Sequence, residues 1–149
     1  MSDAKFQLEI ITPERLAFSD SVDMVTAPAA RGIVGILAHH APLFSRLVEG
    51  EVKVTREGDE YFLAIGGGFM EVTQGRVSIL VTRAVHAKEL NEAEIKKAQA
   101  AAQDVISRKA TAAELATARV MLRRSILDLK VLHKRRYRSS PMDAHSQPS

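Results

Sequence analysis

One glycine-rich stretch, at positions 66–68, has the composition of a loop that could cradle a phosphate group. Phosphate-binding loops place backbone amides at the start of a helix and usually end in Gly-Lys-Ser or Gly-Lys-Thr. Here Phe69 follows the glycines directly, no lysine is present, and both flanking segments have the composition of strands. We therefore interpret the three glycines as a bulge or tight corner between strands.

The adjacent residues His39 and His40 could suggest a metal site. Neighbouring residues on an extended chain point to opposite faces, so the two imidazoles are poorly placed to share an ion. No third ligand stands at a recognisable spacing, the chain has no cysteine, and the other three histidines are isolated. We expect no metal ion and assign the pair a structural or interface role.

Catalytic motifs are also missing from the sequence. The Gly-x-Ser-x-Gly elbow does not occur, and no pair of carboxylates stands in a motif-like context. We therefore predict a protein that is not itself an enzyme and that acts by binding partners.

Basic residues cluster towards the end of the chain. Residues 119–138 contain eight lysines and arginines and one acid, Asp128, so the local charge is 8 − 1 = +7. Such a segment suits an acidic partner: a carboxylate-rich protein segment, a phosphate backbone or an anionic membrane. The alternative is a solvated helix face. Nucleic acid is disfavoured, because Tyr137 is the one aromatic among these residues and no binding-motif spacing is present.

The elements that must position these residues fall into two groups. Residues 6–10 and 52–55 alternate apolar and polar side chains, as half-buried strands do, and further short apolar runs are separated by glycine or proline. This spacing predicts a β-sandwich or barrel over residues 1–86.

From residue 87 the period changes to that of helices. Asn91 with Glu94, and Thr111 with Glu114, each have the spacing of a capping box, and an apolar stripe follows each pair. We predict an antiparallel helical hairpin over residues 87–136 and a disordered tail over residues 137–149. The fold class is α+β, mainly β.

No apolar run approaches the roughly 20 residues of a membrane helix, and the first residues lack the pattern of a signal or transit peptide. We expect a chain that begins near Met1, is not inserted directly in a membrane and resides in a reducing cytoplasm.

Three segments resemble a known family. Residues 32–43 (GIVGILAHHAPL) resemble the G-x-x-G-I-L-x-x-H-A-P-L loop of the ε subunit of F-type ATP synthases. Residues 67–72 (GGFMEV) resemble that family's G-G-F-x-E-V strand start, and residues 77–82 the strand after it. The resemblance covers about residues 5–136. The homologous mitochondrial subunit is called δ, and the missing transit peptide favours the bacterial protein.

The resemblance implies a ten-stranded β-sandwich followed by a two-helix domain in the central stalk, which rotates. It implies that the sandwich binds the γ subunit and the c-ring and so couples proton-driven ring rotation to ATP synthesis. It also implies that the helices reach the α/β catalytic hexamer and inhibit ATP hydrolysis. The subunit would lie peripherally on the cytoplasmic face of the bacterial plasma membrane.

The resemblance also implies which residues form the contact sites, by their positions in the matching segments. The stretch from Arg31 to Leu43 is the expected rotor contact, and the family often has an acidic residue where Arg31 stands. The residues expected at the rotor are Arg31, Gly32, Ile33, His39, His40, Pro42 and Leu43. Contacts with an acidic helix-turn-helix segment of a β subunit are expected from Arg119, Arg123, Arg124, Lys130 and Lys134.

One family feature is degenerate in this chain. Some members bind ATP at the start of the first helix through an I/L-D-x-x-R-A motif. Asn91 stands in place of its Asp, Glu94 in place of its Arg and Ile95 in place of its Ala. A carboxylate at position 94 repels phosphate where the Arg would pair with it. We expect no ATP cofactor.

A hypothesis from another class stays open beside the rotor subunit: a free-standing β-domain adaptor whose basic helix binds nucleic acid or membrane. An enzyme is the third and least supported hypothesis.

Overall fold

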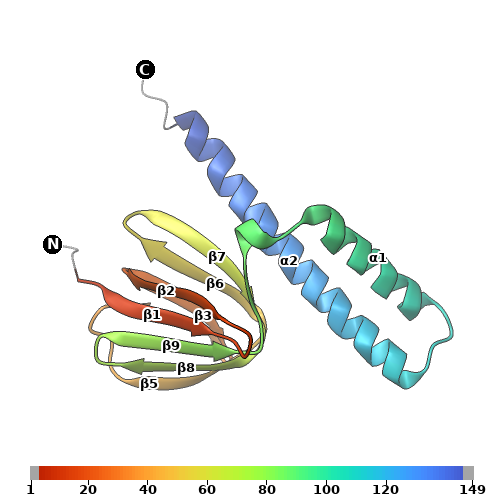
Figure 1. The fold of residues 1–149 in the computed structure, drawn as a ribbon, viewed down its shortest axis with the longest axis horizontal. Coiled ribbons are helices and arrows are strands. Elements are labelled where there is room, and N and C mark those ends of the chain that lie inside the picture. Colours follow the sequence, from red (N-terminus) through yellow and green to blue (C-terminus); the bar gives the residue numbers. More distant parts are fainter. Residues whose placement is uncertain (1–3, 146–149) are drawn as a thin grey trace. The chain divides into compact units, whose positions relative to one another are not determined.

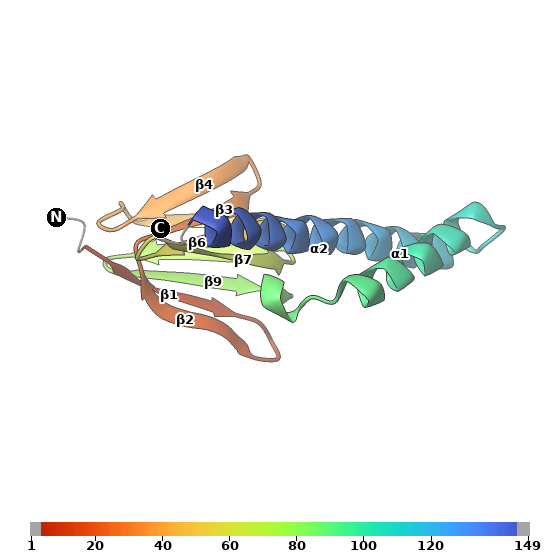
Figure 2. The same ribbon diagram turned by 90° about the horizontal axis from the view of Figure 1, so that it is seen from above.

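The computed structural model describes the backbone of residues 4–145 and the side chains of residues 4–134. The chain divides into two compact units, Met1–His86 and Ala87–Ser149. The first is built of strands and the second of helices, as the colours of Figure 1 show along the sequence and Figure 2 shows from a second direction.

Alternating apolar and polar residues produce the strands of the first unit. In β1, for example, Phe6, Leu8 and Ile10 are buried, and the residues between them are half-buried. The strands are β1 (Phe6–Ile11), β2 (Leu16–Val22), β3 (Met24–Ala29), β4 (Gly32–Leu37), β5 (Leu43–Leu47), β6 (Gly50–Arg56), β7 (Asp59–Ile65), β8 (Gly68–Thr73), β9 (Arg76–Val81) and β10 (Ala84–His86).

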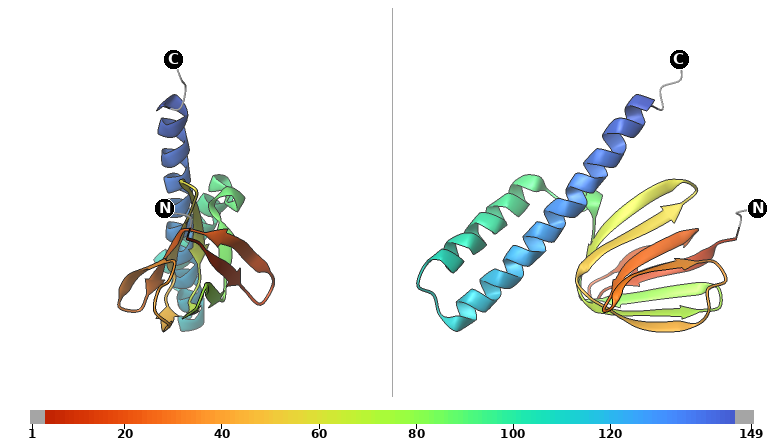
Figure 3. Two further views of the ribbon diagram at one scale, coloured as in Figure 1. Left: turned by 90° about the vertical axis from the view of Figure 1, so that its left-hand side faces the viewer. Right: turned by 180° about the vertical axis from the view of Figure 1, so that it is seen from behind.

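These strands form one ten-stranded sheet in the order β10-β7-β6-β3-β5-β8-β9-β1-β2, with β4 beside β3. The neighbouring pairs are antiparallel except β1 and β9, which run parallel. Figure 3 shows the strands from two further sides, curving around one interior. The predicted ten-stranded, mainly β architecture is confirmed.

The core lies inside this curved sheet and consists mostly of aliphatic side chains. This composition follows from a sequence without tryptophan, in which aromatics make up 5% of the residues. Its fully buried large side chains come from nine strands, β1 to β9: Leu8, Ile10, Val22, Val25, Ile36, Leu47, Val52, Val54, Leu63, Ile65, Met70 and Ile79.

The three consecutive glycines lie at a crossing of backbones. A Cβ on Gly68 would collide with the carbonyl oxygen of Leu80 and would lie 2.7 Å from the Cα of Val81. A Cβ on Gly66 would collide with the side chain of Thr82. The interpretation of residues 66–68 as a tight corner between strands is therefore confirmed, because they connect β7 to β8 with no space for side chains at two of the three positions.

The helical unit contains the 3-10 turn η1 (Ala87–Glu89), α1 (Glu92–Ser107) and α2 (Ala112–His145). Both predicted caps are present. The Asn91 side chain accepts a hydrogen bond from the Glu94 amide at 3.0 Å, and Thr111 and Glu114 each accept from the other's backbone amide, at 3.1 and 3.0 Å. The two helices contact each other along a hairpin joined by residues 108–111.

Helix α2 continues to His145, nine residues past the predicted end near Arg136. The apolar stripe that identified the helix stops earlier, but extending an existing helix requires no new nucleus, so polar residues can continue it. The helical residues 137–145 correct that part of the predicted tail, and residues 146–149 of the tail lie outside the described residues.

Candidate functional site

The residues expected at the rotor do not form a loop. Positions 32–37 form strand β4, which pairs with β3 in the register Gly32↔Ala29 to Leu37↔Met24. The sequence reading missed this strand because Gly-Ile-Val-Gly-Ile-Leu lacks a clear alternation of apolar and polar residues. Because these residues form a strand rather than a loop, the two ends of the candidate site lie far apart.

Strand β4 divides the candidate residues into two groups. Arg31, Gly32 and Ile33 lie at the β3–β4 turn, whereas residues 39–43 follow the other end of the strand. Six extended residues span about 20 Å, so the two groups are separated by that distance along the sheet. One small contact surface could not include both.

The first group is prominently exposed. Ile33 has 80% of its surface exposed, the highest value among the exposed large hydrophobic residues with described side chains, and Arg31 beside it is exposed as well. Gly32 has a φ of +134°, a conformation that side-chain-bearing residues rarely adopt, and it allows the chain to turn from β3 into β4. A single exposed aliphatic residue is ordinary on a protein surface, so this tip is neither a ligand pocket nor, by itself, evidence of a contact.

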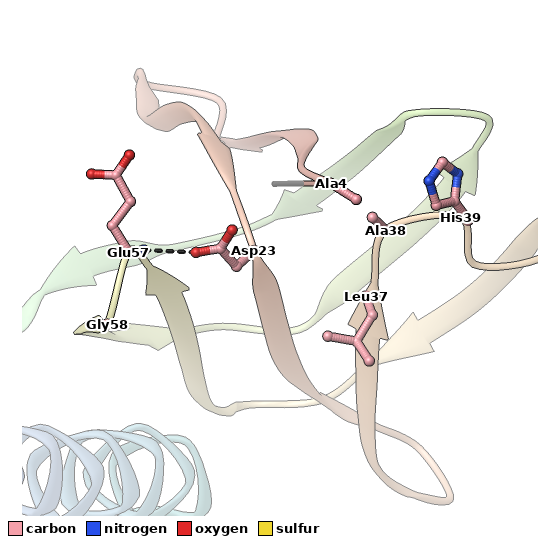
Figure 4. Close-up of a pocket in the computed structure, with 7 residues that line it drawn as sticks. All are labelled: Ala4, Asp23, Leu37, Ala38, His39, Glu57 and Gly58. Atoms are coloured by element: carbon pink, nitrogen blue, oxygen red, sulfur yellow. Dashed lines mark hydrogen bonds between the residues drawn. The ribbon is translucent and has the colours of Figure 1, made fainter. Parts of the chain in front are cut away.

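The second group adjoins a surface pocket of about 530 Å³. Figure 4 shows its lining, in which Leu37, Ala38 and His39 lie opposite Asp23 and the β6–β7 turn. Of the other candidates, His40 and Leu43 are half-buried and Pro42 is exposed.

The charged groups of this pocket are paired with one another. Asp23 accepts a hydrogen bond of 2.6 Å from the Glu57 amide, the contact drawn in Figure 4. Lys5 lies 3.3 Å from the Asp23 carboxylate and 3.5 Å from that of Glu57. The Glu57 amide, and then Lys5, hold the pKa of Asp23 below its ordinary value. These contacts tie together the N-terminal strand, the β2–β3 bend and the β6–β7 turn, which is a structural role.

A second surface, which the sequence reading missed, lies on the outer face of the sheet. The strand registers place Phe69 opposite Leu80, Leu80 opposite Ile11 and Ile11 opposite Leu16. We call these four residues, together with Phe44, the apolar row; the Phe44 and Phe69 rings are 5.5 Å apart.

The apolar row is largely exposed to solvent. The exposed fractions are 67% for Phe44, 49% for Phe69, 51% for Leu80 and 55% for Leu16. Contiguous exposed hydrophobic surface of this kind usually marks a site of protein–protein contact. Apolar residues at the outward positions of β8 and β9 are visible in the sequence, but only the strand register shows that they align.

The basic residues of α2 lie on different faces of the helix. At about 100° per residue, Arg119, Arg123, Lys130 and Lys134 fall within about 60° of one another, whereas Arg124 lies outside that arc. We call these four residues the basic stripe. All four are exposed, and Ile126, which is 52% exposed, lies about 20° beyond one edge of this arc.

The start of α1 uses its residues for local structure. The Asn91 side chain caps the helix, Ile95 is buried, and Glu92 lies 3.0 Å from Lys96 and 3.9 Å from His133 of α2. A shallow depression of about 600 Å³ is present here. Glu94, at the position of the family's Arg, is exposed.

Within the described part of the chain, no three histidine, aspartate or glutamate side chains are grouped in a way that could hold a metal ion. None of the helices searched over those residues has the length and apolar composition needed to cross a membrane.

Comparison with known proteins gives a consistent result. Residues 5–87 match the family model of the ATP synthase delta/epsilon chain, β-sandwich domain. The ATP synthase epsilon chain of Herpetosiphon aurantiacus is 42% identical over 132 residues, which cover 89% of this chain and 97% of the relative. That of Dehalococcoides mccartyi is 41% identical over 134 residues, covering 89% of this chain and 96% of the relative.

Among solved structures, a chain of the Euglena gracilis mitochondrial ATP synthase has the same fold. The TM-score is 0.64 at 22% identity, and the match covers 99% of this chain and 84% of the Euglena chain. The sequence matches extend the likeness from fold to family, because they include the sandwich and most of the helical unit. This chain therefore belongs to the delta/epsilon chain family of ATP synthase subunits.

Proposed function

We propose that this chain is a non-catalytic central-stalk subunit of a proton-translocating F-type ATP synthase. Its sandwich binds the γ subunit and the c-ring and so couples ring rotation to ATP synthesis. Its C-terminal helices act on the α/β hexamer and inhibit ATP hydrolysis. The protein lies peripherally on the cytoplasmic face of the bacterial plasma membrane, as part of the synthase. Family membership supports the assignment, and the apolar row is the observation that carries the binding role.

The apolar row is the docking surface for γ. Its side chains leave water only if a partner covers them, and burial of a Leu or Phe side chain contributes about 1.5–3 kcal/mol. Since Phe69 and Leu80 are already half-buried, docking gains about half of that for each. Together these two residues contribute about 1.5–3 kcal/mol, roughly ten- to a hundredfold in the dissociation constant, and the other contacts of the interface must supply the rest of the affinity.

The tip formed by Arg31, Gly32 and Ile33 is the contact with the c-ring. The exposed Ile33 provides apolar area, and Arg31 provides a cation. The polarity of this contact is the reverse of that in family members with an acidic residue at the position. We expect the ring loop that faces Arg31 to carry an acidic or neutral residue rather than a basic one. Residues 39–43, about 20 Å away, contact the rotor at a separate place.

The basic stripe is the contact with an acidic helix-turn-helix segment of a β subunit. Its four cations are exposed, so their attraction to carboxylates is screened by salt over about 10 Å at 0.1 M ionic strength. Inhibition that depends on this contact should weaken as salt is raised. Ile126, at the edge of the basic stripe, provides an apolar contact that salt does not screen.

The assay is ATP hydrolysis by a purified α/β/γ complex from the same organism. It is titrated with the full-length chain and with a version ending at His86, whose sandwich has a core of its own. We expect both to bind and only the full-length chain to lower the rate. Replacing Arg123 and Lys130 together by glutamine should reduce the inhibition, whereas Arg124→Gln, on another face of the same helix, should reduce it less.

The alternatives give different results. If both versions bind and neither inhibits, the stalk assignment survives and the basic stripe has another partner. If neither binds, and the chain instead shifts duplex DNA or anionic vesicles with a steep salt dependence, the adaptor hypothesis replaces the rotor subunit.

A further inference from the structure

The two ends of the strand path are closed by side chains. Strands β10 and β2 are the terminal strands of the path, and the sheet pairing has no ladder between them. Two hydrogen bonds connect them instead. The Arg15 guanidinium Nη2 donates to the carbonyl oxygen of Ala84 at 2.7 Å, and the His86 ring nitrogen Nε2 lies 2.7 Å from the carbonyl oxygen of Ala17. Because a carbonyl can only accept, Nε2 carries the donated hydrogen.

These bonds originate in an ordered turn. Thr12 is 8% exposed, and its hydroxyl oxygen accepts hydrogen bonds from the amides of Glu14 and Arg15, at 3.3 and 3.1 Å. The Thr12 amide in turn donates to the Arg15 carbonyl at 2.9 Å. The turn therefore fixes the backbone of Arg15, so that ordering the guanidinium against Ala84 costs only the rotamer entropy of the side chain itself.

The strand held in this way is unusually short. Strand β10 has three residues, paired with β7 in the register Ala84↔Ile65 to His86↔Leu63. A three-residue edge strand contributes few ladder bonds, so two side-chain bonds are a large share of what retains it. The chain passes directly from His86 into Ala87, where the helical unit begins.

The same turn also belongs to the docking surface. Leu16 of the apolar row lies between Arg15 and Ala17 in the chain, and its partner Ile11 directly precedes Thr12. A protein that covers Leu16 and Ile11 therefore restrains the turn from which both hydrogen bonds to β10 are made.

We propose that Arg15 and His86, with the carbonyl oxygens of Ala84 and Ala17, form a clasp that couples occupancy of the apolar row to retention of β10. Docking of γ immobilises the β1–β2 turn and so favours the clasped state. Loss of the clasp releases β10 and lengthens the free connection to the helical unit. This coupling rests on the proposed γ docking at the apolar row. Because coupling between two equilibria is reciprocal, opening the clasp must also weaken γ binding.

The test uses two variants of the full-length chain that remove the donors and keep the shape. Arg15→Met retains the aliphatic stem, and His86→Phe retains the ring, whose centroid lies 6.2 Å from that of Phe18. Glu14→Gln is the matched control: it changes an exposed charge on the same turn without touching the clasp. Amide hydrogen exchange of peptides covering residues 84–87 is measured with and without purified γ, and γ affinity is measured by calorimetry.

We expect each clasp variant to speed exchange at residues 84–87 by about tenfold, as loss of one partly buried hydrogen bond implies. Residues 63–65 of β7, which pair with β10, should exchange faster as well, whereas peptides covering β8 and β9 should not change. In the wild-type chain, γ should slow exchange at residues 84–87. The clasp variants should bind γ about two- to fivefold more weakly, and Glu14→Gln should behave as the wild type.

Two results would overturn the coupling. Unchanged exchange at residues 84–87 in both variants would show that the two hydrogen bonds do not retain β10. Faster exchange with unaltered γ affinity would show a clasp without coupling. If the wild-type chain itself does not bind γ, the proposed function fails and the coupling fails with it, whereas the exchange rates of the free variants still report on the clasp.

Discussion

Replacing Gly68 by alanine should destabilise the sandwich strongly. The new Cβ would collide with the Leu80 carbonyl and lie 2.7 Å from the Val81 Cα, so a backbone of β9 must move rather than a flexible side chain. Overpacking of this kind costs about 1–3 kcal/mol. Displacement of β9 from β8 would also weaken ladder bonds worth about 1 kcal/mol each. The lower entropy of the unfolded alanine chain offsets about 0.4–1 kcal/mol. We therefore expect a net loss of about 3 kcal/mol.

The matched control is the neighbouring residue. A Cβ on Gly67 would have its nearest neighbour, the Leu47 carbonyl oxygen, at 3.4 Å, which is ordinary contact. Gly67→Ala should therefore change the free energy of unfolding by less than about 1 kcal/mol. Urea unfolding of the full-length chain, followed by circular dichroism in the β region, gives both values. Equal effects of the two substitutions, or a loss below about 1 kcal/mol for Gly68→Ala, would refute the close approach of β8 and β9.

Three further predictions concern the pocket, the second helix and the nucleotide motif. Because the folded protein holds the Asp23 pKa below its ordinary value, this carboxylate stabilises the fold at neutral pH. Its contribution is lost as the pH falls from about 4 through the lowered pKa. Asp23→Asn should therefore be destabilising in urea unfolding at pH 7, with a smaller effect at pH 3. Thr111→Ala removes the acceptor for the Glu114 amide and should destabilise the helical unit by about 1 kcal/mol. The loss should appear as a helical ellipticity that disappears at a lower temperature on heating. Thr73→Ala, a substitution on strand β8, should leave that transition unchanged. Calorimetry with ATP at millimolar concentration should give no specific binding heat, because Glu94 repels phosphate at the degenerate motif. Detectable ATP binding that substitution of Asn91 or Glu94 abolishes would contradict this expectation.

The local features of the chain were predictable because short-range chemistry determines them. The caps at Asn91 and Thr111 depend on residues three positions apart, and the buried face of β1 depends on a period of two. The corner at residues 66–68 was recognisable from glycine content together with the strand character of its flanks. In each case the residues that decide the structure lie within a few positions of one another.

What could not be predicted depends on pairing across the sheet. Strand β4 lacks alternation because apolar side chains occupy both of its faces, with Ile36 buried and Ile33 and Leu37 exposed, and without this strand the expected rotor residues appeared to form one loop. The apolar row spans five strands, and the contacts of Arg15 and His86 span 69 residues in the chain. The separation of Arg124 from the basic stripe needs only helix geometry, so the predicted second helix was sufficient to derive it.

The parallel pairing of β1 with β9 has a consequence for how the protein is made. Every pair in that ladder joins residues 69 positions apart, from Gln7↔Arg76 to Ile11↔Leu80 (76 − 7 = 69). On the ribosome, β1 can form a hairpin with β2 early, but its other edge stays open until more than 80 residues have been synthesised. The pairing of β1 with β9 is therefore a late step between residues far apart in the chain, and such steps take milliseconds to seconds rather than microseconds. During that interval the growing chain exposes both the unpaired edge of β1 and the apolar side chains of Phe6, Leu8 and Ile10, which makes this stage of synthesis the one most prone to aggregation.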